Sequence, residues 1–410
     1  MRHRLLVIGL VWPEPTSSAA GSRMRQLVEL FVSKGYDVTF ACAASKSPYS
    51  LSLTSLHVQE VSITLNDDSF DLFVQSLAPH AVLFDRFMTE EQYGWRVAKE
   101  CPQAIRILDT EDLHFLRYAR QKQGESLVPN VYNDITKREV AAILRSDLTL
   151  IISREEMKLL QETFRIDPDL LSYLPFLERE ITDDIVSQWN TFECRKDFVF
   201  IGNFLHDPNW QTVLRLKKEI WPLLRKRIPD SHLYIYGAYT PPKALQLHNP
   251  NEHFHIAGRA EDARDTISRY RLLLAPIPYG AGVKGKFIDA MQTGTPAITT
   301  NIGAEAMSDD AESWPGAIAD EYTQFVNRSV DLYQNADAWA HAQKKGVSII
   351  NEQYEAIKWQ QPFWAQLTLT LENLDLHRQQ NFIGQVLQHH SLTSTKYMSL
   401  WIAEKNKYKA

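Results

Sequence analysis

Short apolar segments alternate with amphipathic segments along most of the chain. Leu5–Val11 is a nearly continuous apolar run, which is typical of a strand buried on both faces of a sheet. A loop rich in Pro, Ser and Gly follows, and the apolar residues between 24 and 31 then share one helical face. Gly35 stands where that helix ends, and Asp37–Ala41 is the next predicted strand. This strand-loop-helix-strand unit predicts a parallel sheet.

The alternation continues through both halves of the chain without an internal sequence repeat. Further strands are predicted at Ala81–Phe84, Ile105–Leu108, Leu148–Ile152, Phe198–Ile201, Leu233–Tyr236, Leu272–Pro276 and Ala297–Thr300. We therefore predict an α/β protein of two Rossmann-like domains, residues 1–180 and 190–355, facing one another across a cleft. Loops at the carboxyl ends of both sheets are expected in that cleft, and rotation about a linker near 176–197 is expected to close it.

Two local signals refine the predicted helices. Ser153 and Glu156 have the spacing of a capping box at a helix start. Asp207 followed by Pro208 marks another helix start, and Pro222 is expected to kink or end that helix.

The C-terminal residues lie beyond both predicted domains. Residues 356–375 are expected to form a helix that packs back on the first domain, and 376–410 form an appended tail. The tail holds an apolar group at Met398, Leu400, Trp401 and Ile402, followed by the basic residues of Lys405–Lys409. A helix packed on the body and a peripheral contact with a membrane surface both fit this pattern.

Composition and charge narrow the function classes. The 410 residues carry a net charge of −6, so no overall basic field recruits nucleic acid. Cys42, Cys101 and Cys194 lie far apart, which argues against a zinc site or a disulfide framework and suits a reducing cytoplasm. The basic start and first apolar run imitate a signal peptide, but a strand, a loop and a helix explain the same residues. No apolar run reaches the ~20 residues needed to cross a bilayer.

Residues 276–307 carry the most informative pattern. A strand ends at Pro276 and leads into a loop with Gly280, Gly282 and Gly285, after which a helix begins. Glycines let backbone N–H groups approach a ligand closely, and the helix start adds a positive dipole end. Lys284 and Lys286 add charge, so a diphosphate is the expected occupant. A plain glycine turn before a surface helix is the alternative.

This stretch resembles the C-terminal signature of GT-B glycosyltransferases, specifically the retaining family 4 (glycosyl transferases group 1) in its glycine/lysine-loop subtype. The residues that carry the resemblance are Gly282, Lys284, Lys286, Asp289, Ala290, Met291, Gly294, Pro296, Gly303 and Glu305. The resemblance extends to about residue 370 and implies transfer of a hexosyl group from a nucleotide-sugar donor, with retention and without metal. The nucleotide sugar is a substrate, so no cofactor is expected, and the acceptor (a glycan, a lipid-linked molecule or a protein) is left open.

The resemblance also implies a set of donor contacts. Asp289 is expected to bind the ribose hydroxyls, and Gly258 with Arg259 belongs to the loop that reads the nucleotide base. The remaining expected donor-binding residues, including the glycine loop that faces the diphosphate in the first domain, are Gly21, Arg23, Arg25, Asn203, Ala281, Gly282, Val283, Lys284 and Lys286. The family usually has two glutamates eight residues apart here. Ala281 replaces the first, which often contacts the donor sugar.

A charged segment after a strand of the first domain is the second candidate region. Residues 109–117 resemble a motif that lines the cleft in the family, and Asp109, His114 and Arg117 are the expected contacts for the transferred sugar or the acceptor. A structural role for His114 is equally open. Asp85 and Arg86 are further acceptor candidates. With Lys284 and Lys286, Asp109 and His114 complete the predicted catalytic set. The Asp167-Pro168-Asp169 triplet matches a metal-binding pattern of another fold, and no metal is predicted.

The predicted chemistry follows from charge. Breaking the bond from the anomeric carbon to the diphosphate builds negative charge that fixed lysines and amides would stabilise. Two alternatives are a sugar-nucleotide epimerase and a non-catalytic GT-B module that binds nucleotide sugars.

Overall fold

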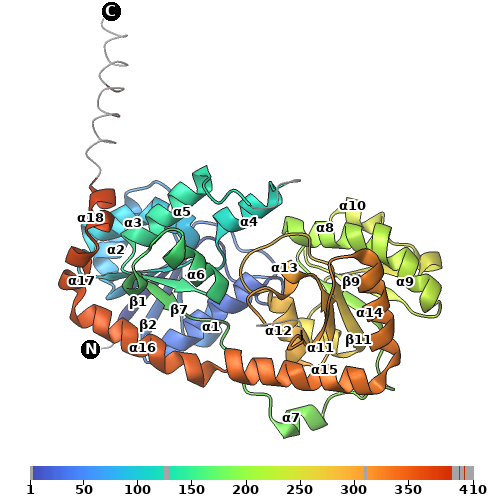
Figure 1. Ribbon diagram of the computed structural model, residues 1–410. Coiled ribbons are helices and arrows are strands. Elements are labelled where there is room, and N and C mark those ends of the chain that lie inside the picture. The colour runs from blue at the N-terminus through green and yellow to red at the C-terminus, as the bar shows by residue number, and fades with distance from the viewer. Residues whose placement is uncertain (1–2, 124–128, 309–311, 390–396, 398–400, 402–410) are drawn as a thin grey trace, which may run out of the picture.

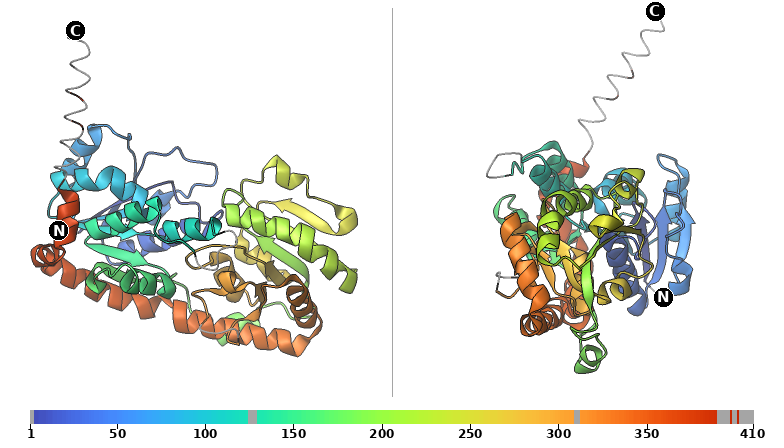
Figure 2. Two further views of the ribbon diagram at one scale, coloured as in Figure 1. Left: turned by 45° about the horizontal axis from the view of Figure 1, so that its top comes forward. Right: turned by 90° about the vertical axis from the view of Figure 1, so that its right-hand side faces the viewer.

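The computed structural model describes residues 3–123, 129–308, 312–389, 397 and 401. Two α/β domains lie side by side, and a pair of consecutive long helices runs along both of them (Figure 1). The further views in Figure 2 show each sheet sandwiched between helices. The prediction of two Rossmann-like domains is therefore confirmed.

The first domain is built on a seven-stranded parallel sheet in the order β3-β2-β1-β4-β5-β6-β7. Its strands are β1 (Arg4–Gly9), β2 (Asp37–Cys42), β3 (Gln59–Ser62), β4 (Ala81–Asp85), β5 (Ile105–Asp109), β6 (Leu148–Ile151) and β7 (Leu171–Tyr173). Its helices are α1 (Ala19–Ser33), α2 (Ser69–Leu77), α3 (Arg86–Glu100), α4 (His114–Gln121), α5 (Asp134–Arg145) and α6 (Arg154–Glu162). In β1, Leu5 and Val7 enter the core on one face of the sheet and Leu6 and Ile8 the core on the other, so both faces are buried.

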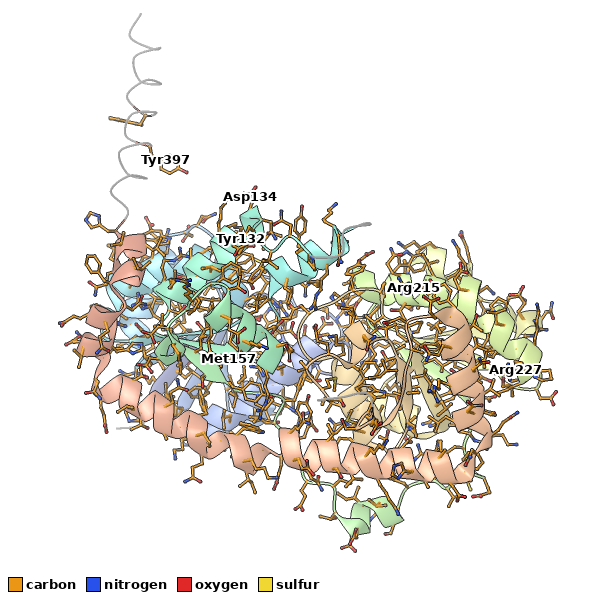
Figure 3. All side chains as sticks on the ribbon, in the orientation of Figure 1. Tyr132, Asp134, Met157, Arg215, Arg227 and Tyr397 are labelled. Atoms are coloured by element: carbon orange, nitrogen blue, oxygen red, sulfur yellow. The ribbon has the colours of Figure 1, made fainter. Side chains whose placement is uncertain are left out.

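The second domain repeats this plan with six parallel strands in the order β10-β9-β8-β11-β12-β13. Its strands are β8 (Lys196–Ile201), β9 (Leu233–Tyr236), β10 (Phe254–Gly258), β11 (Tyr270–Ala275), β12 (Ala297–Thr299) and β13 (Gly316–Ile318). Its helices are α7 (Asp183–Ser187), α8 (Asp207–Arg215), α9 (Trp221–Arg227), α10 (Pro242–Leu245), α11 (Ala263–Ser268), α12 (Gly285–Gln292), α13 (Asn301–Ala304), α14 (Tyr322–Gln334) and α15 (Ala336–Ile349). Figure 3 shows the side chains that fill the space between sheet and helices, with Arg215 and Arg227 on the outer pair α8 and α9.

Helix α8 ends at Arg215, before Pro222, the residue that was expected to kink or end that helix. A π-helical turn at Leu216–Ile220 joins α8 to α9, and Pro222 falls in the first turn of α9. A proline is tolerated in the first turn of a helix, because the N–H that it lacks has no partner there within the helix.

The chain crosses between the domains twice at one place. Glu178 leaves the first domain, and the backbone returns through a second π-helical turn, Ile350–Tyr354, that leads into α16 (Ala356–Glu372). The amide of Glu178 donates to the Tyr354 carbonyl at 2.8 Å, and the amide of Ala356 donates to the Glu178 carbonyl at 2.9 Å. The two crossings are thus hydrogen-bonded to each other.

Helix α16 packs along the first domain. Phe363 and Leu367 are buried in the core that also contains Phe31. Two shorter helices follow, α17 (Leu374–Gln380) and α18 (Phe382–Gln388). The predicted tail contacts at Met398, Leu400, Ile402 and Lys405–Lys409 lie outside the described residues. No helix in the described part of the chain is long and apolar enough to cross a membrane.

Four short strands are absent from the sequence-based prediction. All four are edge strands: β3 and β7 end the first sheet, and β10 and β13 end the second. Strand β3 has no buried residue and β13 has none either, so neither shows the apolar run by which the central strands are recognised.

Candidate active site between the two domains

A cavity of about 490 Å³ lies between the domains, at the carboxyl ends of both sheets. This volume falls within the range of small-molecule sites. The first domain contributes residues 15–20, Arg86, Glu111, Asp112, His114 and Arg117. The second domain contributes Asn203, His206, Asn209, Arg259, Asp289, 279–281 and 283–286, among others.

Helix α12 begins directly at the cavity. The β11 strand ends at Ala275, and residues 276–284 bring the chain to the helix start. Lys284 takes the N-cap position, and no side chain caps the first amides of the helix. Unpaired first-turn N–H groups together with the helix dipole favour an anion at this point.

Both lysines of the loop are half-buried, and no carboxylate of the described residues contacts either of them directly. Lys286 Nζ donates to Asn209 Oδ1 at 2.7 Å and lies 4.3 Å from the centre of the Phe200 ring. Burial lowers the pKa of Lys286 to about 7. Lys284 Nζ donates to the Gly282 carbonyl at 3.0 Å, and burial lowers its pKa to about 8 although Glu305 partly opposes the shift. Two desolvated cations without a bound carboxylate are suited to receive an anionic ligand.

The start of α1 faces the start of α12 across the cavity. Ser18 caps α1 by accepting a hydrogen bond from the Gly21 amide at 3.1 Å. A Cβ on Gly285 would lie 2.6 Å from Ala19 Cβ, and a Cβ on Gly21 would lie 2.4 Å from the Glu14 backbone. Glycine at position 285 therefore permits the close approach of the two helix starts, whose dipoles add at one place, and glycine at position 21 lets the chain at Glu14 pack against the start of α1.

Asp289 lies one helical turn beyond Lys286 and is held in an ion-pair network. Arg264 donates to Asp289 Oδ1 and to Glu178 Oε2, both at 2.8 Å. Burial raises the pKa of Asp289, and Arg264 opposes this shift. Because Glu178 lies where the chain crosses between the domains, Arg264 links that crossing to this wall of the cavity.

Arg259 bridges the two domains at another edge of the cavity. Its guanidinium group donates to Thr16 Oγ1 at 2.6 Å and lies 4.4 Å from the centre of the Tyr49 ring. Its Nε is buried and has no hydrogen-bond partner among the described residues. Gly258 precedes it with a φ of +77° and turns the chain there.

The wall from the first domain is formed by the start of α4. Arg117 donates to the Asp112 carboxylate, and His114 Nδ1 lies 3.4 Å from both Asp112 Oδ1 and Glu139 Oε1. Burial disfavours the charged form of His114, but Asp112 and Glu139 outweigh it and raise its pKa. Burial opposes ionisation of Asp112 as well, yet Arg117 and His114 lower its pKa. The charges of Asp112, His114 and Arg117 therefore compensate one another within this wall.

Two residues of this wall have left-handed backbone conformations. Arg86 has a φ of +70° and Glu111 a φ of +65°, and they follow the adjacent strands β4 and β5. Such conformations are costly for residues with a side chain and cluster at functional sites.

The structure places the sequence-predicted residues in two groups. The predicted residues that line the cavity are Arg86, His114, Arg117, Asn203, Arg259, Ala281, Val283, Lys284, Lys286 and Asp289. The predicted residues that do not line it are Gly21, Arg23, Arg25, Asp85, Asp109, Gly258 and Gly282.

Arg23 and Asp109 are the clearest corrections. Only 1% of each side chain is exposed, and they form an ion pair at 2.8 Å inside the first domain. Arg23 also donates to the Leu174 carbonyl at 2.8 Å, so it joins α1 to β5 and to the chain after β7. Arg25 lies on the surface, paired with Glu29 at 2.7 Å. Both guanidinium groups are thus paired with carboxylates of the first domain rather than directed toward a nucleotide sugar in the cavity.

Asp85 and Gly282 are also occupied by internal contacts. Asp85 accepts a hydrogen bond from the Leu10 amide at 3.0 Å and is buried. The Gly282 amide donates to Glu156 Oε1 at 2.8 Å and therefore points toward the first domain.

Glu156 is the most important residue that sequence reasoning missed. Ser153 accepts from the Glu156 amide, as the capping-box pattern predicted, but the Glu156 side chain does not return the bond. It instead accepts from the amides of Leu113 and Gly282 and so ties α4 to the glycine loop of the other domain. Burial, together with Asp112, raises its pKa to about 8. The sequence pattern identified Glu156 only as a helix-start residue and did not indicate this contact between the domains.

A second cross-domain contact involves Arg120 on α4. Its guanidinium group donates to both Glu305 oxygens at 2.6 Å and to the Gly280 carbonyl at 2.7 Å.

Within the described residues, no group of His, Cys, Asp and Glu side chains is arranged to hold a metal ion.

Comparison with known proteins bears on this geometry. Residues 195–335 match the family described as glycosyl transferases group 1. The chain therefore carries a glycosyltransferase group 1 domain. Lys284, Lys286 and Asp289 lie inside this domain. The chain is also 24% identical over 167 residues to an uncharacterised 44.6 kDa protein in the cps region of Klebsiella pneumoniae, which covers 39% of this chain and 43% of that protein. The match thus spans less than half the length of that relative.

Solved structures share the complete two-domain arrangement. Sucrose-phosphate synthase from Thermosynechococcus elongatus has a TM-score of 0.66 at 15% identity, with 91% of this chain and 100% of that chain covered. An S. aureus TarM mutant in complex with fondaparinux, α-GlcNAc-glycerol and UDP has a TM-score of 0.69 at 8% identity, covering 89% and 99%. Anabaena HepE in complex with UDP and glucose has a TM-score of 0.63 at 10% identity, covering 90% and 100%. The shared architecture is the GT-B fold.

Proposed function

We propose that this protein is a glycosyltransferase that moves a hexosyl group from a nucleotide-sugar donor to an acceptor hydroxyl. The observation that carries the proposal is the pair of desolvated lysines at the start of α12, facing the start of α1 in a cavity between two Rossmann-like domains. The group 1 domain and the UDP complexes of the structural neighbours support a nucleotide-sugar donor.

The proposed site binds the donor in three parts. The diphosphate lies at the two helix starts, with Lys284 and Lys286 as its counter-charges. Asp289 accepts hydrogen bonds from the ribose hydroxyls, and the base lies near Gly258 and Arg259. The sugar then extends along the glycine loop toward the wall that contains His114, Arg117 and Arg86.

The proposed reaction proceeds with retention, as in family 4 of the glycosyltransferases. The bond between the anomeric carbon and the β-phosphate oxygen breaks, and a bond from the acceptor oxygen forms on the same face. The departing phosphate takes the acceptor proton. Lysines and amides fixed before the reaction stabilise the negative charge of the leaving diphosphate, so this chain's own groups meet the demand that a metal ion meets elsewhere. The glycine/lysine loop supports assignment to this subtype, and we propose a cytoplasmic enzyme.

The test is a donor screen followed by product analysis. Thermal unfolding is measured with UDP-, GDP-, ADP- and dTDP-sugars, since a ligand at one hundred times its dissociation constant stabilises by ~2.7 kcal/mol. The stabilising donor is then incubated with the protein alone and with candidate acceptors. Transfer or slow hydrolysis of the donor is the expected result.

Other outcomes would contradict the proposal in distinct ways. An altered nucleotide sugar formed without acceptor would indicate an epimerase. Binding with neither transfer nor hydrolysis, over a broad acceptor panel, would indicate a non-catalytic module.

A further inference from the structure

Glu111 lies on the first-domain wall of the cavity, in the turn between β5 and α4. The amide of Asp112 donates to the Thr110 carbonyl at 2.8 Å, which closes a three-residue turn with Glu111 at its centre. Thr110 is anchored in turn by its hydroxyl, which donates to the Leu150 carbonyl of β6 at 3.1 Å. With a φ of +65° at Glu111, this is the rare, strained form of the γ-turn.

Among the described residues, the carboxyl group of Glu111 has no hydrogen-bond partner. Asp112 next to it is paired with Arg117, and Asp85 and Asp109 accept from Leu10 and Arg23. By contrast, across the residues that the structure describes, no group donates to Glu111, which lines the cavity. Arg86 and Arg117 act on it through longer-range attraction only.

The turn at Glu111 rests directly on the glycine loop of the group 1 domain. A Cβ on Gly282 would lie 2.8 Å from Asp112 Cβ and 3.4 Å from the Glu111 carbonyl oxygen. Ala281 lines the cavity beside this contact and brings no polar side chain. A sugar joined to a diphosphate at the start of α12 would have to pass along this loop.

We propose that Glu111 binds hydroxyl groups of the sugar that is transferred, in place of a polar side chain on the glycine loop. The inference rests on the proposed function. A carboxylate can accept two hydrogen bonds from neighbouring hydroxyls, and bonds to a charged acceptor are strong. Burial and the nearby Asp112 raise the pKa of Glu111 to about 7, as expected for a carboxyl group that still lacks such donors.

The experiment compares the affinity for a nucleotide sugar with the affinity for the nucleoside diphosphate alone. Dissociation constants are measured by calorimetry for UDP-glucose, GDP-mannose, ADP-glucose and dTDP-glucose and for the four parent diphosphates. The proteins are the full-length chain, Glu111→Gln, and the matched control Glu155→Gln, whose carboxyl group is exposed on α6. Glu111→Gln preserves the size of the side chain, removes its charge and replaces one of its two acceptor oxygens with an NH2 donor.

The expected result is selective. The preference is the dissociation constant of the diphosphate divided by that of the nucleotide sugar. For the donor that the unaltered protein prefers, this ratio should fall at least about tenfold in Glu111→Gln, while the dissociation constant of the diphosphate changes less than about twofold. Glu155→Gln should match the unaltered protein. Equal losses for both ligands would mean a structural role, and lowered turnover with unchanged donor affinity would mean an acceptor contact. Either would overturn the proposal. If the unaltered protein binds none of the eight ligands, the proposed function itself fails.

A second pair of variants separates strain from function. Glycine adopts a φ of +65° without cost, so Glu111→Gly should unfold at a temperature higher than Glu111→Ala by about 2 °C or more. Both variants should nevertheless lose the preference for the nucleotide sugar. Retention of that preference in Glu111→Gly would contradict a role for the carboxylate.

Discussion

The two walls of the cavity differ in whether their cations have carboxylate partners. On the first-domain wall the cations have carboxylate partners, as Arg117 has in Asp112. On the α12 wall, Lys286 contacts an amide oxygen and an aromatic ring instead, and burial alone lowers its pKa. A wall whose cations are already paired can orient uncharged groups such as sugar hydroxyls, whereas a desolvated cation without a carboxylate partner gains further stabilisation when an anion binds. The comparison therefore supports the proposal that the diphosphate binds at the α12 wall and the sugar at the first-domain wall.

Loss of Lys286 should have the largest effect. Lys286→Ala removes a fixed positive charge next to the leaving group, and turnover should fall more than about one hundredfold. Donor turnover is measured under saturation. Lys226→Ala on the exposed side of α9 is the control and should leave turnover unchanged. If Lys286→Ala keeps normal turnover, the α12 wall does not carry the charge of the reaction.

Affinity for the diphosphate should depend on pH because the α12 lysines titrate near neutrality. With pKa values of about 7 for Lys286 and about 8 for Lys284, the empty site loses protons as pH rises through this range. Binding of an anion favours the protonated lysines, so it takes up protons, and affinity should fall by up to about tenfold per pH unit for each lysine above its pKa. Calorimetry between pH 6.5 and 9 measures this slope, and Lys286→Met should reduce it. An affinity that rises with pH would exclude the lysines as ligands.

Loss of the close contact between the two walls should reduce catalysis less than loss of the Lys286 charge. Gly282 has a φ of +63°, and a methyl group there would lie 2.8 Å from Asp112 Cβ. Gly282→Ala therefore costs about 1–2 kcal/mol in the closed arrangement, and kcat/KM should fall about tenfold. Gly280→Ala is the matched control, since its methyl group would meet only Lys284 Cε at 3.6 Å. Equal effects of the two variants would show that the contact with Asp112 is unimportant.

The ion pair between Arg120 and Glu305 should give the smallest effect. It joins the domains but remains partly exposed, with 13% and 25% of the side chains accessible. A double-mutant cycle of Arg120→Ala and Glu305→Gln should give a coupling energy of about 0.5–1 kcal/mol in kcat/KM. Strictly additive single effects would mean that the pair does not contribute to closure.

The sequence predicted the α12 wall better than the first-domain wall, and the reason is physical. Lys284, Lys286 and Asp289 lie within six residues on one loop and helix, so their shared location follows from local structure alone. Glu156 and Gly282 are 126 residues apart, and Arg120 and Glu305 are 185 apart. Contacts over such separations depend on how the domains meet, which no local pattern encodes.

The errors in the predicted first-domain residues also come from contacts between residues that are far apart in the sequence. The family resemblance implied Arg23 as a donor contact because it follows the glycine loop at Gly21. Its ion pair with Asp109, 86 residues away, satisfies the charge of the arginine inside the domain. The central strands were predictable because their apolar runs are continuous, whereas the short edge strands bury too little to be recognised.

The most direct measurement is the affinity of the four nucleoside diphosphates for the unaltered protein, Lys286→Ala and Lys226→Ala at pH 7. At least one diphosphate should bind, and its affinity should fall at least about tenfold in Lys286→Ala and remain unchanged in Lys226→Ala. If no diphosphate binds, or if Lys286→Ala binds it as tightly as the unaltered protein does, the start of α12 is not the site of the donor diphosphate.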